Sequence, residues 1–546
     1  MVLAIGCGGP PPPPPSPVVI AHPIAAPAPA SCDPGVPAAA CTAYLATAKT
    51  GALARCDHPT GAWRYALVAP LYTPVDDISA DQLRAMWRGE ARVHLAASAD
   101  TTAALAPALG TARIEPLPDR RAVRWAIVPA DELSPAWKIV TVGGAHPLRD
   151  DSGVLSVGLC GGPITNVDPK EITTLAMTGV TAMARFTAKL MDRKGTTYPA
   201  RDIASWFEHT DYVHISNEVS FVPDCEPSAD RGQPFCSREQ YIELMAKVHA
   251  NLVELDGSHL DDFGSKWLTH TIEMYEQRGW HFFGGGRDQV EASRPLLLDD
   301  KAGTKLAFLG CNMPHSTSHT IRNRPDVAYC DLARLEYQIA DLRHQGYTPI
   351  VSIQHEEVYT HAPPDIVVHD FRRLAAAGAA VVFGSQAHFA HPFEVVDGAF
   401  VHYGAGNLFF DQSWKGARDA TNDRFYFHHG KLLAVDHLFT RLEEAGRPRP
   451  MTGEERALFL KTLDDERAKL PPANPWSVPH EMKMDAIPDD FLIAKQPIAL
   501  SIRLAGGGAT ATLRRAVPIR KKLLVPAIVA FVAKKYGVEP AQVSVR

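Results

Sequence analysis

Short apolar runs recur along residues 171–470, and amphipathic segments of helical length separate them. The runs are residues 175–180, 212–215, 252–255, 306–309, 350–353 and 380–383. Alternation of buried strands with helices predicts an α/β fold. A two-residue Asp397-Gly398 turn then predicts a hairpin, so the sheet should end in antiparallel strands. We therefore expect an α/β core.

The chain is too long for one hydrophobic core. At 546 residues it exceeds the length at which single cores stop growing, so roughly two to four domains are expected. Composition and strand pattern divide it into a Pro- and Ala-rich linker at 1–37, a smaller α/β domain at 38–165, the main domain at 166–470 and a short appendage at 471–546. Residues 71–89 resemble part of phosphate-type periplasmic binding domains. The appendage contains a predicted hairpin around 506–508 and an apolar run at 523–533 that is too short to span a bilayer.

The first residues, MVLAIGC, form a short apolar run that ends in Gly6-Cys7, and a proline tract follows at 10–15. This order is typical of the end of a lipoprotein signal followed by a stiff tether. Because no basic segment precedes the run, an ordinary N-terminus is the alternative. The lipoprotein interpretation predicts membrane anchoring through a lipid on Cys7.

The cysteine content indicates export. Eight cysteines remain when Cys7 is set aside, and eight can form four disulfides. Cys225 and Cys236 flank one polar loop, and Cys311 and Cys330 flank another, so a bridge within each pair is expected. Structural zinc is the competing interpretation, but the sequence contains no C-x2-C pair. We expect an extracytoplasmic protein of the cell envelope.

The overall charge gives no reason to expect nucleic acid as a partner. The formal net charge is -6, and charged residues make up 21% of an otherwise ordinary globular composition. Neither binding of nucleic acid nor electrostatic binding to an anionic membrane is predicted.

Polar side chains follow successive predicted strands, where open α/β sheets place their ligand sites. They are Asn217 and Glu218; Asp256, Ser258, His259 and Asp262; Gln354, His355, Glu357 and Tyr359; Gln386 and His388; and Asn407 and Asp411. Carboxylates, imidazoles and amides from several strand ends are what a divalent metal site needs, and two ions there would clamp a phosphoryl group. Each residue alone has a structural explanation, since the chain contains 23 histidines. Their joint placement predicts a divalent metal site at this edge of the sheet.

Four blocks of this pattern resemble the CapA family, which is associated with poly-gamma-glutamate capsule synthesis. They are Asn217-Glu218, GSHLDDFG at 257–264, GSQAHFAHPFE at 384–394 and YGAGNLFFDQ at 403–412, in the family's order. The resemblance implies a calcineurin-like metallophosphoesterase fold over about residues 172–470, which is a layered sandwich of mixed sheets flanked by helices. It also implies a divalent metal ion and a partnership with the capsule-synthesis machinery.

Departures from the family pattern concern the metal site. Val180 stands where the family has a metal-binding Asp, and Ser258, Gln354 and Gln386 replace an Asn and two His. The resemblance leaves four metal ligands, of which the last two are also the catalytic candidates: Glu218, His259, Glu357 and His388. The expected substrate-binding residues are Asn217, Ser258, Gln354, Tyr359, Gln386 and Asn407. One ion fits this set better than two.

Two functions from different classes follow. One is a metal-dependent hydrolase or transferase of the envelope. In it, a metal bound by Glu218, His259 and His388 activates water or polarises a phosphoryl or acyl group, with Glu357 as ligand or base. The other is a non-catalytic extracellular protein that binds an anionic polymer or a small ligand in a degenerate pocket. A purely structural lipoprotein is less favoured, because it would leave the polar strand ends without a purpose.

Overall fold

The computed structural model describes residues 28–471 except 118–123, 151–152, 154, 227–233, 301–302, 314–325 and 415. Beyond residue 471 it describes the backbone of five strands: β27 (Leu492–Ile493), β28 (Ile498–Leu504), β29 (Gly507–Leu513), β30 (Ile519–Arg520) and β31 (Val543–Val545). Strands β28 and β29 pair antiparallel and form the hairpin predicted around 506–508. The expected lipid anchor at Cys7, the proline tract and the apolar run at 523–533 lie outside the described residues.

The main domain contains two mixed sheets. The first has the order β14 (His281–Phe283), β13 (Leu252–Glu254), β12 (Tyr212–Asn217), β10 (Ile172–Met177), β24 (Asp419–His428), β25 (Lys431–Glu444) and β26 (Arg447–Pro450), with β11 (Val180–Thr181) and β23 (Asn407–Phe409) attached. The second has the order β16 (Leu296–Asp299), β17 (Lys305–Asn312), β19 (Thr348–Gln354), β20 (Val381–Gly384), β22 (Ala399–His402) and β21 (Phe393–Val396). A short β15 (Gly285–Gly286) pairs with β18 (Asp326–Val327) beside helix α8 (Gln289–Ala292).

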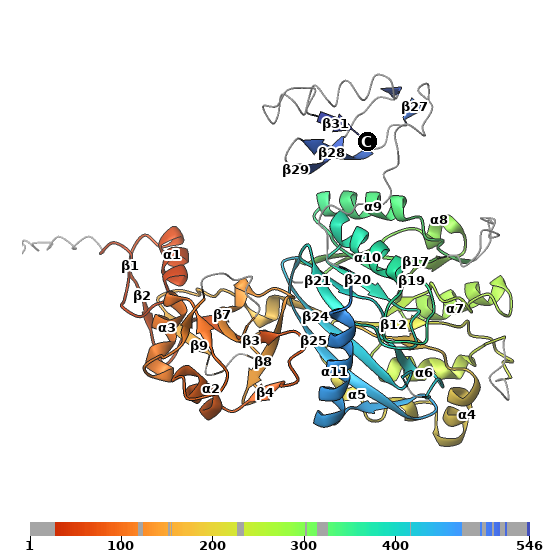
Figure 1. The fold of residues 1–546 in the computed structure, drawn as a ribbon, viewed down its shortest axis with the longest axis horizontal. Coiled ribbons are helices and arrows are strands. Elements are labelled where there is room, and N and C mark those ends of the chain that lie inside the picture. Colours follow the sequence, from red (N-terminus) through yellow and green to blue (C-terminus); the bar gives the residue numbers. More distant parts are fainter. Residues whose placement is uncertain are drawn as a thin grey trace, which may run out of the picture.

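The two sheets pack face to face with helices on both outer surfaces, which gives four layers (Figure 1). Leu175, Phe308, Phe383 and Phe425 lie in the apolar layer between the sheets. Helices α4 (Arg185–Lys194), α5 (Ala204–Phe207), α6 (Ile242–Lys247) and α7 (Ser265–Gln277) cover the first sheet, and α9 (Leu332–His344) and α10 (Asp365–Ala377) cover the second. The predicted fold class, mixed sheets flanked by helices, is confirmed.

Two turns explain how the strands are interrupted and joined. The run predicted as one strand at 175–180 is split into β10 and β11, and a Cβ on Gly179 would lie 2.0 Å from the carbonyl oxygen of Gly406. Glycine is required at this close backbone approach. Asp397 (φ 52°) and Gly398 (φ 83°) form the predicted tight turn between β21 and β22.

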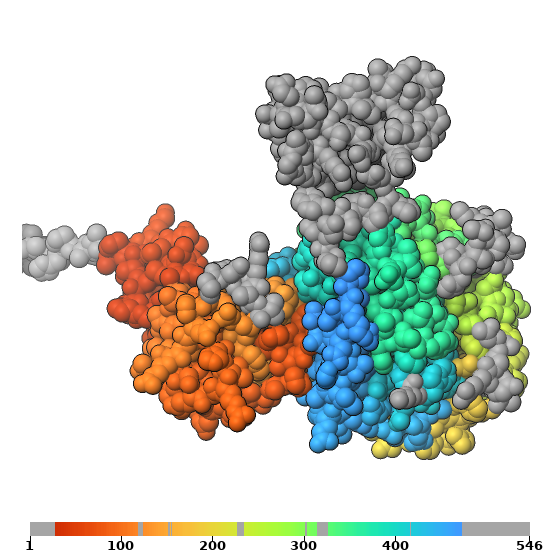
Figure 2. Space-filling model, viewed as in Figure 1, coloured from red at the N-terminus to blue at the C-terminus, as the bar shows by residue number. Residues whose placement is uncertain are grey.

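The N-terminal unit forms a separate lobe, shown in red and orange in Figure 2. Its sheet has the order β1 (Ser31–Cys32), β2 (Ala52–Arg55), β9 (Ser156–Cys160), β3 (Gly61–Pro70), β7 (Ala126–Pro129), β5 (Ala96–Ala97) and β6 (Glu115–Pro116). In addition, β8 (Trp137–Val142) pairs with β3, and β4 (Asp77–Ile78) pairs with β8. Helices α1 (Ala38–Thr47), α2 (Ala80–Trp87) and α3 (Ala99–Leu109) complete it. The ring of Tyr72 stacks on that of Phe393 at 4.6 Å between centroids, and its hydroxyl donates to the Phe393 carbonyl at 2.7 Å. These contacts join the lobe to the main domain.

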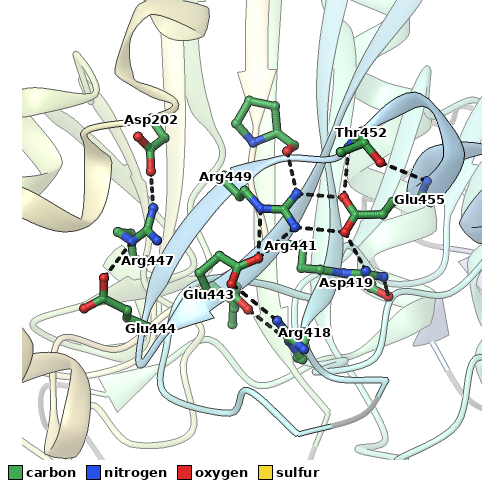
Figure 3. Close-up of polar contacts among 12 residues, drawn as sticks. Asp202, Arg418, Asp419, Arg441, Glu443, Glu444, Arg447, Arg449, Thr452 and Glu455 are labelled. Carbon is green, nitrogen blue, oxygen red and sulfur yellow. Dashed lines mark hydrogen bonds and ion pairs between the residues drawn. The ribbon is translucent and has the colours of Figure 1, made fainter.

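Helix α11 (Gly453–Arg467) is fastened to β24–β26 by an ion-pair network (Figure 3). Its capping box joins Thr452 and Glu455, since each side chain accepts from the other's backbone N–H. Glu455 also accepts from Arg449 and Arg441, and Arg441 pairs with Asp419 at 2.6 Å. The hydrogen bonds from Arg449 hold the pKa of Glu455 well below its ordinary value.

Four disulfides connect the described cysteines. Cys225–Cys236 and Cys311–Cys330 are the two local bridges that the sequence predicted. The other two, which the sequence left open, are Cys32–Cys41 and Cys56–Cys160. Structural disulfides persist in oxidising compartments, so this content indicates an extracytoplasmic location. Within the part of the chain that the structure describes, no helix combines the length and the apolar character needed to cross a bilayer.

Candidate functional site

The polar residues predicted to gather at the strand ends lie around one edge of the two sheets. Asn217 ends β12, Gln354 ends β19 and Asn407 begins β23. Strands β12 and β13 run parallel in the first sheet, and β19 and β20 run parallel in the second. Side chains that follow them therefore meet at the carboxyl end of both sheets, as expected for an open α/β fold.

Glu218 lies buried at the bottom of this edge, with 3% of its surface exposed. Its Oε1 accepts from the backbone N–H of Ser258 at 3.1 Å and from the Ser258 hydroxyl at 2.9 Å. Its Oε2 accepts from the Gln354 amide at 2.5 Å. Burial raises the pKa of Glu218, although nearby His259 and His388 act in the opposite direction. Two of the residues that depart from the family pattern thus occupy both oxygens of this carboxylate.

His259 is held by a carboxylate behind it. Its Nδ1 lies 2.8 Å from Oδ2 of Asp262, which also accepts from the Phe235 backbone N–H at 2.7 Å. Burial alone would lower the pKa of His259, but Asp262, Glu218 and Glu357 outweigh it, and the pKa is raised. Because Nδ1 is engaged, Nε2 is the atom that His259 can offer to a ligand.

His388 presents the most informative geometry. The amide nitrogen of Asn407 donates to the carbonyl of Ala417 at 3.1 Å, so its Oδ1 is the atom facing Nδ1 of His388 at 2.8 Å. Nδ1 must therefore carry a proton, which leaves Nε2 with a lone pair in the neutral ring. That Nε2 lies 3.3 Å from Oε1 of Glu357. Two acceptors face each other, so a proton or a cation must lie between them.

Tyr359 closes the outer side of this pair. Its hydroxyl donates to Oε1 of Glu357, and its ring lies over His388 at 6.4 Å between centroids. Burial and the Glu357 carboxylate raise the pKa of Tyr359 to about 12. Half of Tyr359 is exposed, and Trp414 lies 6.1 Å away between ring centroids. An aromatic rim therefore borders His388 and Glu357.

Arg185 is a site residue that sequence reasoning missed. Its guanidinium lies 4.7 Å from the ring centroids of both Phe235 and Phe410, and it forms a buried ion pair with Asp411. Its backbone has φ 47°, a conformation that non-glycine residues seldom adopt. Asp411 belonged to the pattern at the strand ends, but no motif singled out Arg185. Cation–π contact with both rings fixes this charge beside the site.

The predicted substrate-binding residues divide into different environments. Ser258 and Gln354 contact Glu218, Asn407 orients His388 and Tyr359 is exposed. Asn217 instead turns towards α7, where its amide donates to the Tyr275 hydroxyl at 2.9 Å. Gln386 is buried, and within the described part of the chain its Oε1 has no hydrogen-bond partner. Ligand contact by these residues stays a prediction.

The four predicted metal ligands come together only in part. Val180 is fully buried among apolar side chains and offers no ligand atom. His259 and His388 each have Nδ1 held by an oxygen, the arrangement that orients Nε2 towards a metal. The facing acceptors of His388 and Glu357, 3.3 Å apart, are the part of the set nearest to the geometry of a cation site. Among the described residues, no three of the four predicted ligands lie within 4.8 Å of one another, so neither Glu218 nor His259 forms a close triad with that pair.

Two facing mixed sheets with outer helices and a His, Glu and amide set at the strand ends define a protein of the metallophosphoesterase-like class. The model of the bacterial capsule synthesis protein family PGA_cap matches residues 174–412. Residues 174–412 thus match the family of bacterial capsule synthesis proteins that the four sequence blocks resemble.

Two proteins similar to this chain are named for roles in capsule or polyglutamine synthesis. The capsule biosynthesis protein CapA of Bacillus anthracis is 20% identical over 314 residues, which cover 55% of this chain and 75% of CapA. A probable polyglutamine synthesis accessory protein of Mycobacterium tuberculosis is 27% identical over 227 residues, 39% of this chain and 58% of that protein. This chain thus spans less than two thirds of the second relative. The NAD nucleotidase of Haemophilus influenzae has a TM-score of 0.31 at 12% identity, covering 55% of this chain and 59% of its own.

Proposed function

We propose that this protein acts at the cell envelope in the synthesis or export of poly-gamma-glutamate or a related capsular polymer. The family match over residues 174–412 and the descriptions of the relatives support this role. The four disulfides support a site of action outside the cytoplasm. A lipid on Cys7 would hold the protein at the membrane, close to the capsule-synthesis machinery.

The site at the strand ends is proposed to bind a single divalent ion. The facing acceptors on His388 and Glu357, 3.3 Å apart, carry this proposal. His259 would add Nε2 after a side-chain movement, and Glu218 would have to give up a hydrogen bond to Ser258 or Gln354 to take part. Because Val180 cannot act as a ligand and Gln354 and Ser258 occupy Glu218, a second ion has too few ligands.

The residues around the ion have separable roles. A bound divalent ion supplies Lewis-acid polarisation of a phosphoryl or acyl oxygen. Asn407 and Asp262 fix the orientations of His388 and His259. Glu357, whose side chain is one-third exposed beside His388, is placed to accept a proton from an attacking group. Exposed Tyr359 would contact an anionic polymer or a smaller substrate at the rim.

A non-catalytic binding protein for an anionic polymer or a small ligand is the alternative. It is favoured by one observation, that both oxygens of Glu218 are already satisfied by Ser258 and Gln354. A carboxylate whose two oxygens both accept hydrogen bonds can keep the surrounding side chains in place without a metal ion. In that case His388 is protonated and forms an ion pair with Glu357.

Elemental analysis of the purified full chain tests these alternatives. We expect the double variant His259→Ala/His388→Ala to contain about one equivalent of divalent metal less than wild type, because each of its two substitutions removes one ligand. Exposed His209 and His249 provide the matched control, because His209→Ala/His249→Ala removes two imidazoles elsewhere. Equal metal content in all three proteins would contradict the single-ion site and favour the binding protein.

A further inference from the structure

We propose that Glu171, His428 and His429 form a second metal site, which binds a divalent transition-metal ion such as Zn²⁺ beside the junction of the two lobes. Among the described residues, these three are the group of His, Cys, Asp or Glu side chains whose ligand atoms all lie within 4.8 Å of one another. The site shares no residue with the strand-end site, and its chemistry is independent of the proposed function.

The spacing of the ligand atoms matches a bridging ion. Oε2 of Glu171 lies 3.6 Å from Nε2 of His428 and 3.4 Å from Nε2 of His429. These distances are too long for good hydrogen bonds. Ligand atoms at about 2.0–2.1 Å from a tetrahedral Zn²⁺ lie about 3.3 Å from each other. Two imidazoles and one carboxylate are also a ligand set that zinc uses, with one position left for water.

Strand register brings the three residues together. Ile172 of β10 pairs with His428 of β24, so Glu171 emerges beside the end of β24. His428 pairs with Lys431 across a two-residue turn that consists of His429 and Gly430. The carbonyl of Gly430 accepts from the Thr348 hydroxyl at 2.6 Å, which fixes the turn against the second sheet. The cluster is therefore held by rigid elements.

His429 occupies a backbone position that favours other residues. Its φ is 48° and that of Gly430 is 78°, the arrangement of a tight hairpin turn in which Asn, Asp or Gly is usual at the first position. A histidine at this position has a backbone cost that an imidazole role would explain. The turn places its ring 4.1 Å from that of His428, between centroids.

Charge and burial at the cluster favour a bound cation. The Glu171 carboxylate lies beside both imidazoles, and the neighbouring Lys431 ammonium donates to the Asp131 carbonyl at 2.7 Å. Nε2 of His428 is buried, so coordination would satisfy an atom that water does not reach.

Zinc titration of the full chain by calorimetry tests the site, in the His259→Ala/His388→Ala background so that only the second site contributes. We expect one equivalent to bind. His429→Asn suits the turn and removes one ligand, and Glu171→Gln keeps the shape and removes the charge. Each should weaken binding by more than about tenfold, the lower end of what even an outer-shell substitution costs.

His209→Asn is the matched control, because His209 is also exposed with a positive φ of 59°. It should leave zinc affinity unchanged. Zinc should also raise the melting temperature of the background protein but not that of the His429→Asn form, with far-UV circular dichroism confirming that both are folded. Absence of zinc binding in the background protein, or unchanged affinity in both ligand variants, would overturn the proposal.

Discussion

Replacing Cys56 and Cys160 with serine is expected to lower the free energy of unfolding of the N-terminal lobe by about 4 to 5 kcal/mol. The bridge closes the longest loop of the four disulfides, with a sequence separation of 104 residues. It joins the residue after β2 to the last residue of β9, at one end of the lobe's sheet. Removing it releases loop-closure entropy in the unfolded chain, which grows with loop length.

Urea unfolding followed by tryptophan fluorescence measures this effect, because the buried Trp63, Trp87 and Trp137 report on the lobe. The double variant Cys32→Ser/Cys41→Ser is the control from the same lobe, since its separation is only 9 residues. The same entropy relation gives a smaller loss of about 2.6 kcal/mol for such a short loop. Equal losses for the two pairs, or none for Cys56 and Cys160, would show that the long bridge does not constrain the unfolded chain.

The Cys56–Cys160 disulfide could not be predicted from the sequence, whereas two other disulfides could. Cys225–Cys236 and Cys311–Cys330 were predictable because each pair flanks a short polar loop. Cys56–Cys160 joins two segments whose proximity arises only once β2 pairs with β9. Non-local pairing of this kind leaves no local pattern in the sequence.

The same division applies to the main fold. Strands such as β12 and β19 are buried along nearly their whole length, so their sequences are apolar runs that identify them directly. The long strands β24 and β25 carry charged residues such as Asp423, Arg424 and Asp436 and gave no such run. They return to the first sheet beside β10, a partner that only the folded chain reveals. Boundaries of the four predicted domains stay predictions.

At the site, topology was predictable and side-chain direction was not. Asn217 ends β12 and Glu218 follows it directly, yet Asn217 contacts α7 and Glu218 contacts Ser258 and Gln354. Successive residues at a strand end point to opposite faces, and which one enters the site depends on the register. The location of Arg185 at the site was also unpredictable, because its guanidinium lies against the rings of Phe235 and Phe410, which are distant in sequence.

The buried carboxylate of Asp423 is expected to be one of the main polar contributors to stability in the main domain. Its Oδ2 lies 2.6 Å from Nδ1 of His402 on the second sheet, and its Oδ1 lies 2.7 Å from Nδ1 of His437 on the first. All three side chains are almost completely buried between the sheets. Asp423→Ala leaves two imidazoles without an acceptor, so we expect a loss of about 3 to 5 kcal/mol in the free energy of unfolding.

Asp423→Asn separates charge from shape and gives the contribution a pH signature. Burial alone would raise the pKa of Asp423, but His402 and His437 outweigh it and hold the pKa well below its ordinary value. A carboxyl whose pKa is depressed by folding contributes stability above its unfolded pKa, about 3.9, and loses it as pH falls towards the folded value. Urea unfolding at pH 7, 5 and 3 should therefore show that the difference in free energy of unfolding between wild type and Asp423→Asn shrinks below about pH 4.

Exposed Asp81 supplies the control Asp81→Ala, which should unfold like wild type. If the difference in free energy of unfolding between wild type and Asp423→Asn does not change with pH, the charge of Asp423 does not contribute to stability. The two histidines would then need only its hydrogen-bond acceptors.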